Sequence, residues 1–501
     1  MKDHSNNSKN IIYSLISQIV VLGLALIVPR LIISNYGSDT NGLISTVTQI
    51  TAYLALLESG IGRATRNELY KYIHNESYDK SSISSVISIS KKTYQDTTKI
   101  YLLFVLLLSI ILPFVIKTEL SYLTVFLVIL IEGLSNVLSY YYVQYWSDLL
   151  VADGKSYINT NIDLIYRIII YVIKISLAIL NVNIIIMEIG FFFAILVKLT
   201  IFRKYMRRLY YWIEYNNTGE KLTDKNSYII AEIAWTVFSS TDLIILSVFC
   251  STKSASVYSV YSLLFLSLNK ILDAVYTSTK YMLGQTYHDN LEQYKTTHDL
   301  FNSIFIGTIT AMMTVMYYLC IPFVELYTKG INDIEYVDKN LPFAFCMIII
   351  LSWSRMVAEH LNGIAGYAKQ LGVISVIESF LNLFLSIALV TKYGIYGVLF
   401  ATVISLPIKI IYCNWLSDKI IMKRKAIRTI VIVGSNILLF SILALIKNYI
   451  RVSIDSYLTL CIYGIVFTLI SIILFLIINS VINKDIYKLI RKITITKSDN
   501  L

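Results

Sequence analysis

Four basic side chains lie deep inside long apolar segments of the chain: Arg167, Lys174, Lys270 and Arg355. A cation in the middle of such a segment is costly, by about 2.5–3.5 kcal/mol on insertion scales for a membrane helix. It therefore needs a partner or a polar cavity. Arginine offers a planar fork that fits two oxygens of one phosphate, and lysine offers a compact positive charge. The residue types thus favour the binding of a phosphorylated anion.

Acidic residues accompany these cations at helical spacing. Asp163 precedes Arg167 by four positions, Asp273 follows Lys270 by three, and Glu359 follows Arg355 by four. Residues three or four apart share a helix face. Two interpretations remain open: the polar faces line a water-filled cavity, or they form a structural network of ion pairs.

Three further residues are candidates for the same site. Arg30, near the outer end of the first apolar segment, is a fifth candidate for substrate binding. Glu58, like Asp163, Asp273 and Glu359, either binds a coupling proton or sodium ion or pairs with a cation. Pro29 lacks an amide donor and can bend its helix, so it is a candidate for gating, although the bend could equally be static.

The sequence provides no pattern for catalysis, a metal ion or a cofactor. The five cysteines lie in or at the ends of apolar runs without CxxC spacing, and the five histidines are scattered. We expect no enzyme activity, and no cofactor other than a coupling gradient of protons or sodium. The polar segments are too short to fold a nucleic-acid-binding domain.

Composition determines which elements must position these residues. Hydrophobic residues make up 56% of the 501 positions and charged residues only 15%, so the chain must be embedded in a bilayer. Apolar runs of about twenty residues predict an all-α protein with about fourteen membrane-spanning helices. We expect them at 11–33, 42–62, 100–116, 122–146, 159–180, 184–202, 227–250, 255–284, 300–324, 341–364, 371–390, 393–417, 429–446 and 456–481.

Lysine and arginine support this topology, because they collect on the cytoplasmic side of a membrane. Alternate loops, including 63–99, 203–226 and 418–428, are strongly basic, whereas the loops between them contain few cations. We therefore expect a multi-pass membrane protein with both termini in the cytoplasm. The first apolar run is too long for a signal sequence, so we expect it to be retained as a span.

Several segments resemble a known family. Residues 31–63, LIISNYGSDTNGLISTVTQITAYLALLESGIGR, resemble the second-helix region of polysaccharide transporters in the multidrug/oligosaccharidyl-lipid/polysaccharide (MOP) exporter superfamily, where the helix ends in a Gly-x-Gly-like step, here Gly60 and Gly62. The turn Ala152–Lys155 and the segment Lys392–Ser405 are also similar to that family. With six, six and two spans, the resemblance covers essentially the whole chain.

The resemblance implies a fold and a function. It implies two six-helix lobes, 1–220 and 221–426, around a central cavity as in transporters of the MATE type, with 427–501 forming two additional helices and a basic tail. The implied protein is a flippase of a bacterial cytoplasmic (inner) membrane. It moves undecaprenyl-pyrophosphate-linked oligosaccharide units from the inner to the outer leaflet by alternating access, for assembly of O-antigen, capsule or exopolysaccharide. Membrane lipids and a polysaccharide polymerase are the implied partners.

Two other function classes compete with this one. A cation-coupled multidrug exporter shares the architecture, but we expect it to have an acidic or aromatic cavity rather than deep arginine and lysine. A membrane enzyme of polysaccharide assembly generally needs a large outer loop or a constellation of histidine and carboxylate. The longest outer loop expected here, about residues 325–340, contains no histidine.

Overall fold

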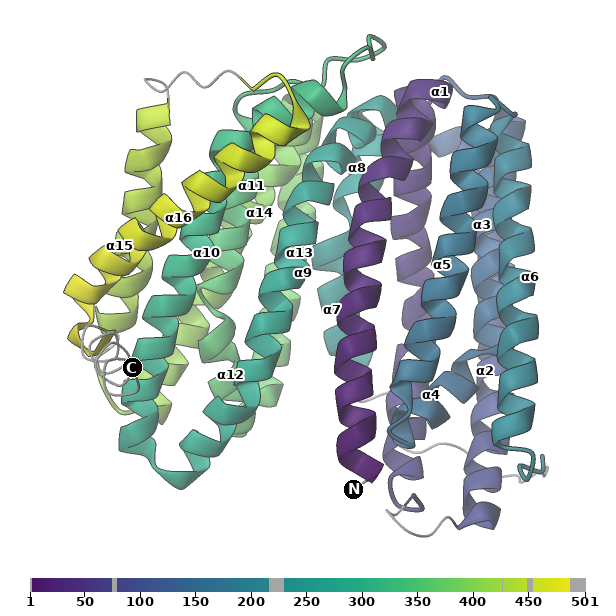
Figure 1. Cartoon of the computed structure of the whole chain (residues 1–501), viewed down its shortest axis with the longest axis horizontal. Helices are drawn as coiled ribbons and strands as arrows, with labels where there is room; N and C mark the ends of the chain where they lie inside the picture. Colours follow the sequence, from purple (N-terminus) through teal and green to yellow (C-terminus); the bar gives the residue numbers. More distant parts are fainter. Residues whose placement is uncertain (1, 74–78, 216–228, 426, 448–453, 487–501) are drawn as a thin grey trace. The chain divides into compact units, whose positions relative to one another are not determined.

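The computed structural model describes residues 2–73, 79–215, 229–425, 427–447 and 454–486. Helices dominate this part of the chain, and no strand is formed within it (Figure 1). The helices divide into two compact units, unit 1 at Met1–Val257 and unit 2 at Tyr258–Leu501. Each unit has its own interior and is described by itself.

The described residues of unit 1 form eight helices and the beginning of a ninth. Their bounds are α1 (Lys2–Leu69), α2 (Lys80–Val115), α3 (Tyr122–Tyr142), α4 (Gln144–Ala152), α5 (Ser156–Ile179), α6 (Ile184–Leu209), α7 (Ile229–Ser240), α8 (Asp242–Phe249) and α9 (Thr252–Asp289). The helices α7 and α8 pack against α1. They therefore belong to unit 1, which ends at Val257, and the expected lobes at 1–220 and 221–426 stay a prediction.

The long helix α1 contains two of the expected spans, which meet at a bend. Gly37 adopts φ 84° and ψ 165°, a backbone conformation that favours glycine. Just beyond the bend, one carboxylate oxygen of Asp39 accepts a hydrogen bond of 2.7 Å from the Thr118 hydroxyl and another of 2.7 Å from the amide of Glu119. The other oxygen accepts a hydrogen bond from Thr252. Asp39 therefore fixes the bend to the loop after α2 and to the start of α9.

Gly42 gives the clearest test of this packing. A Cβ atom at Gly42 would lie 1.7 Å from the carbonyl oxygen of Thr252, whereas a Cβ at Gly23 of the same helix would meet nothing within 4 Å. We expect Gly42→Ala to lower the free energy of unfolding by about 3 kcal/mol, because backbone must move to relieve the clash. Gly23→Ala should instead stabilise the helix slightly. Thermal unfolding in detergent measures both, and equal stability of the two variants would contradict this packing.

Unit 2 contains the remainder of α9 and the later helices. These are α10 (Leu291–Tyr327), α11 (Leu341–Trp353), α12 (Met356–Ile364), α13 (Ala368–Tyr393), α14 (Ile395–Trp415), the π-helical turn η1 (Leu416–Ile421), α15 (Ile427–Ile446) and α16 (Tyr457–Ile482). The helices α15 and α16 both pack against α10. The two amides of Asn436 and Asn479 exchange hydrogen bonds of 3.0 and 2.9 Å. Gly307 of α10 leaves room for them, because a Cβ there would lie 2.7 Å from Asn479.

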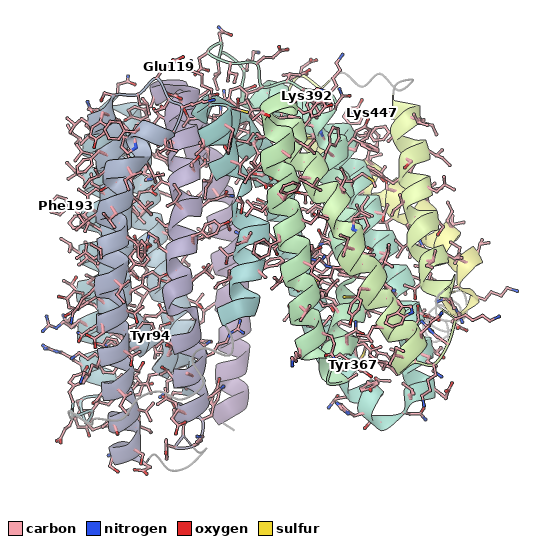
Figure 2. All side chains as sticks on the ribbon, turned by 180° about the vertical axis from the view of Figure 1, so that it is seen from behind. Tyr94, Glu119, Phe193, Tyr367, Lys392 and Lys447 are labelled. Carbon is pink, nitrogen blue, oxygen red and sulfur yellow. The ribbon has the colours of Figure 1, made fainter. Side chains whose placement is uncertain are left out.

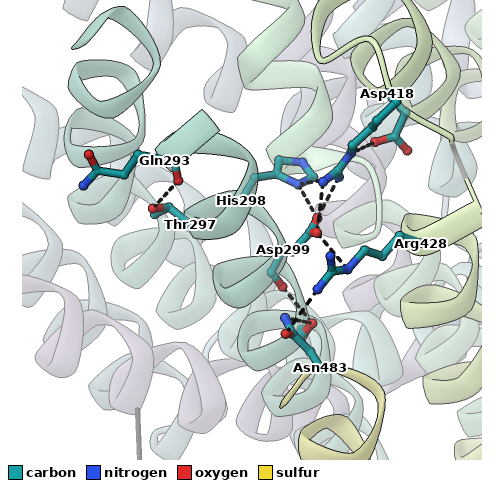
Figure 3. Close-up of polar contacts among 9 residues, drawn as sticks. Gln293, Thr297, His298, Asp299, Asp418, Arg428 and Asn483 are labelled. Carbon is teal, nitrogen blue, oxygen red and sulfur yellow. Dashed lines mark hydrogen bonds and ion pairs between the residues drawn. The ribbon is translucent and has the colours of Figure 1, made fainter. Parts of the chain in front are cut away.

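Buried charges hold the segment after α14 against α10 (Figure 3). The Arg424 guanidinium donates to both oxygens of Asp299, at 2.9 and 2.7 Å, and its Nε donates to Asp418 at 2.8 Å. Arg428 Nε lies 2.9 Å from the same Asp299 carboxylate. Such a bidentate arrangement fixes geometry as well as charge, so it positions the start of α15.

Eleven helical stretches of the described chain are long and apolar enough to cross a membrane. Many of their apolar side chains are exposed, such as Phe193, which projects outward from α6 and is 59% exposed (Figure 2). Apolar surface on this scale is typical of a protein solvated by lipid. The expected all-helical, multi-pass class is therefore confirmed, while the count of fourteen spans stays a prediction.

Candidate functional site

Arg355 belongs to a buried group of four charged side chains in unit 2. It lies at the break between α11 and α12 and is only 3% exposed. Its Nη1 donates to Glu378 of α13, and its Nε lies 3.5 Å from Glu359 of α12. Lys409 of α14 donates to the other oxygen of Glu359 at 2.8 Å. Two cations and two carboxylates from four elements thus alternate in one network.

Local sequence explains why these helices meet at this point. On α13, Glu378, Asn382 and Ser386 recur at intervals of four and are all buried. The Asn382 amide donates to Thr402 of α14 at 2.9 Å and to Ser405 at 3.4 Å. Each hydrogen bond of this kind between membrane helices stabilises their packing by about 0.6 kcal/mol. The polar stripe on α13 therefore directs Glu378 toward the break that presents Arg355.

The charge balance of this group limits what it can do. Removing one member of a buried ion pair leaves an uncompensated charge, which costs about 3–5 kcal/mol. Arg355 already contacts two carboxylates, and a phosphate would have to displace one of them. In this conformation the guanidinium of Arg355 is paired with Glu378 and Glu359, and its role in substrate binding stays a prediction.

A second buried group lies in unit 1 and contains Lys174. The ammonium of Lys174 on α5 lies 3.3 Å from Glu188 on α6, which is fully buried. Glu132 of α3 is also buried and interacts electrostatically with both. The second oxygen of Glu188 has no hydrogen-bond partner among the described atoms. One lysine therefore faces two carboxylates, and this leaves an excess of one negative charge unless a proton or metal cation binds.

Asp163 pairs with a cation on a neighbouring helix. Its carboxylate lies 2.7 Å from the ammonium of Lys198 on α6. Arg167, one turn further along α5, is exposed, and the described residues provide it with no salt bridge. Asp163 therefore pairs with a cation of α6 and not with one of its own helix, and a role for it in ion coupling stays a prediction.

The remaining predicted residues are more scattered. Lys270 and Asp273 are both exposed near the middle of α9. Arg30 is half-buried on α1, beside Pro29. The helix continues through this proline, and its non-helical residue is Gly37. The side chain of Glu58 lies outside the described residues. Within unit 2, Arg355 and Glu359 share one network of ion pairs. The neighbouring stretch of α9 packs beside them, because Trp353 donates to Asn269 at 2.6 Å and the Tyr276 hydroxyl donates to the carbonyl of Met356 at 2.6 Å.

The glycine step that carried the family resemblance has a packing role. A Cβ atom at Gly62 would lie 3.1 Å from Arg66, 3.1 Å from Asp148 and 3.0 Å from the hydroxyl of Tyr94. Arg66 and Asp148 form a salt bridge, and Tyr94, labelled in Figure 2, donates to the same carboxylate at 2.8 Å. Gly62 thus lets α1 approach an ion pair that connects it to α2 and α4.

Sequence reasoning missed three charged partners: Glu188, Glu378 and the pairing role of Lys409. All three lie within expected spans, where the cost that singled out the basic residues applies to carboxylates as well. A search for acidic residues inside apolar runs would have found Glu188 and Glu378. Their partners lie on other helices, so helical spacing could not connect them.

Comparisons with known proteins identify the fold. No protein-family model and no curated sequence matches the chain. Among solved structures, the lipid II flippase MurJ in an inward closed conformation is similar, with a TM-score of 0.69 at 15% identity, covering 95% of this chain and 100% of that one. An inward-facing multidrug resistance transporter of the MATE family and MOP superfamily gives a TM-score of 0.60 at 13% identity, with coverage of 86% and 98%.

A MOP superfamily transporter from Pyrococcus furiosus is also similar, with a TM-score of 0.54 at 10% identity and coverage of 82% and 95%. Since these structures span nearly their whole lengths in the match, the likeness extends beyond one lobe. The chain therefore has the fold shared by MurJ and the MATE transporters, as the resemblance of residues 31–63 predicted.

Proposed function

We propose that this protein is a flippase for lipid-linked oligosaccharide, which moves an undecaprenyl-pyrophosphate-linked repeat unit from the inner to the outer leaflet of a bacterial cytoplasmic membrane. Both termini would be cytoplasmic, and the product would supply O-antigen, capsule or exopolysaccharide assembly. The similar protein MurJ is named a lipid II flippase, and this favours a lipid-linked substrate over a soluble drug for the present protein.

One observation carries the proposal: each unit exposes a cation near the middle of a long helix. Arg167 is the twelfth of the 24 residues of α5, and Lys270 lies equally deep in the 38 residues of α9. Both are exposed, unlike Arg355 and Lys174. An exposed charge at this depth is costly against lipid and is explained by a hydrated path with an anionic cargo. Each cation would contact the pyrophosphate at one stage of transport.

Substitution of these two cations tests the proposal. Arg167→Gln and Lys270→Gln should each slow export of lipid-linked glycan about fivefold, equivalent to about 1 kcal/mol of lost phosphate attraction. Lys369→Gln removes an exposed cation at the start of α13 and is the matched control. The measurement is surface glycan in cells with equal amounts of each variant in the membrane.

The outcome separates the two transport classes. Wild-type export by both Arg167→Gln and Lys270→Gln would contradict the proposed contacts. If cells lacking the protein retain normal surface glycan but become sensitive to cationic drugs, the multidrug exporter is the correct class.

A further inference from the structure

Unit 1 contains a basic and aromatic cavity whose described lining includes none of the residues assigned above to transport. Its volume is about 920 Å³, and residues of α2, α3, α4 and α6 and of the segment after α6 line it. Three lining residues are cations: Lys91, Arg203 and Arg207. Tyrosines and Trp146 form most of the remaining wall, and the described lining contains no aspartate or glutamate. The cavity therefore carries uncompensated positive charge.

The two arginines lie one turn apart on the same face of α6, where like charges destabilise a helix. Neither forms a salt bridge with a described residue. Opposite them, the Lys91 ammonium lies 3.6 Å from the centroid of the Tyr215 ring, and this cation–π contact holds it at the cavity. An anion with several oxygens would relieve the repulsion and accept hydrogen bonds from both guanidinium groups.

The same face of α6 continues away from the cavity as an apolar stripe. Ile186, Ile189, Phe193 and Leu196 follow one another at intervals of three or four and are 37–59% exposed. The stripe then passes through Thr200 to the two arginines, and Leu196 and Thr200 themselves line the cavity. An apolar stripe that ends in cations fits a molecule with an acyl chain and an anionic head, and does not fit a small soluble anion.

From this arrangement we propose that the cavity binds the phosphate headgroup of an anionic membrane lipid, with an acyl chain along the stripe on α6. Arg203 and Arg207 bind the phosphate, and Lys91 contributes a third positive charge. The aromatic wall suits the same depth, because tyrosine and tryptophan favour the headgroup region of a bilayer. The lipid would thereby connect α6 to α2 and α4.

Lipid binding by the purified full-length chain tests the site. Native mass spectrometry measures the affinity for phosphatidylglycerol, phosphatidylcholine with the same acyl chains, glycerol phosphate and undecaprenyl pyrophosphate. Arg203→Gln/Arg207→Gln removes the two cations that line the cavity. Lys204→Gln/Arg208→Gln is the matched control, since it removes two exposed cations from the same helix end that do not line the cavity.

We expect phosphatidylglycerol to bind more tightly than phosphatidylcholine, and the double variant of the cavity to lose roughly 30-fold in affinity while the control changes far less. A preference for undecaprenyl pyrophosphate that is lost in the same variant would support the site and identify the transported lipid as its source. Equal losses in both double variants, or equally tight binding of glycerol phosphate, would overturn the proposal. If the double variant does not fold, Arg207→Gln alone provides the same comparison against Arg208→Gln.

Discussion

Replacing Arg355 with alanine should lower the free energy of unfolding by about 3–5 kcal/mol and reduce the amount of protein in the membrane. The reason is the carboxylate of Glu378, which is as deeply buried as Arg355 and would lose its cation. Lys409 cannot replace the lost charge easily, because its ammonium is already bound to Glu359 at 2.8 Å. Chemical unfolding in detergent measures the change.

Arg428→Ala is the matched control. Arg428 also lies 2.9 Å from a buried carboxylate, that of Asp299, but it is 51% exposed and Arg424 binds the same carboxylate with two hydrogen bonds. Its loss should therefore cost less than about 1 kcal/mol. Similar losses from Arg355→Ala and Arg428→Ala would show that the four-residue network contributes little.

A rescue experiment separates a structural role from a role in transport. Glu378→Gln in the background of Arg355→Ala removes the uncompensated charge, so the double variant should regain most of its stability. We expect it to regain glycan export as well. A double variant that is stable and abundant but does not export would show instead that the Arg355 guanidinium binds the headgroup, as its depth in the sequence first indicated.

The helices of this protein are predictable from its apolar runs, because a segment in lipid must satisfy its own backbone hydrogen bonds and therefore forms a helix. The ends of the helices are harder to predict. The expected third span at 100–116 is only the last part of α2, which begins at Lys80. Ile83 and Ile87 are fully buried, so packing within unit 1 extends this helix through a serine-rich segment that lacks the length of apolar sequence typical of a span.

The site was predictable in part, for a related physical reason. The free-energy cost of placing a charged side chain in a bilayer identifies which charges need a partner. This cost made Lys174 and Arg355 candidates from the sequence. The partner is decided by how helices pack, and this is not encoded in spacing along one helix. Asp163 illustrates the point: its helical neighbours are Arg167 and Lys174, yet it pairs with Lys198 across to α6. Lys174 instead forms an ion pair with Glu188 of α6.

The excess carboxylate beside Lys174 is a candidate for coupling the proposed transport to an ion gradient. Glu132 and Glu188 are both buried around a single lysine, and one oxygen of Glu188 has no hydrogen-bond partner in the described structure. One carboxyl group is neutralised by Lys174, and the other is neutral only with a bound proton or metal cation. We propose that this second carboxyl group carries the coupling ion, which would be a proton or sodium.

Glu132→Gln should therefore abolish the response of transport to the coupling gradient while the Lys174–Glu188 pair keeps the fold. For one coupled proton, a gradient of one pH unit supplies about 1.4 kcal/mol, enough for about tenfold accumulation of substrate. Proteoliposomes with and without a pH or sodium gradient measure this ratio, which should fall from about tenfold to one in the variant.

Glu119→Gln, which neutralises a carboxylate that is 77% exposed, should leave the ratio unchanged. A Glu132→Gln protein that still accumulates substrate in response to either gradient would exclude this carboxyl group as the coupling site, and an equal loss in Glu119→Gln would mean that the effect is not specific to the buried group.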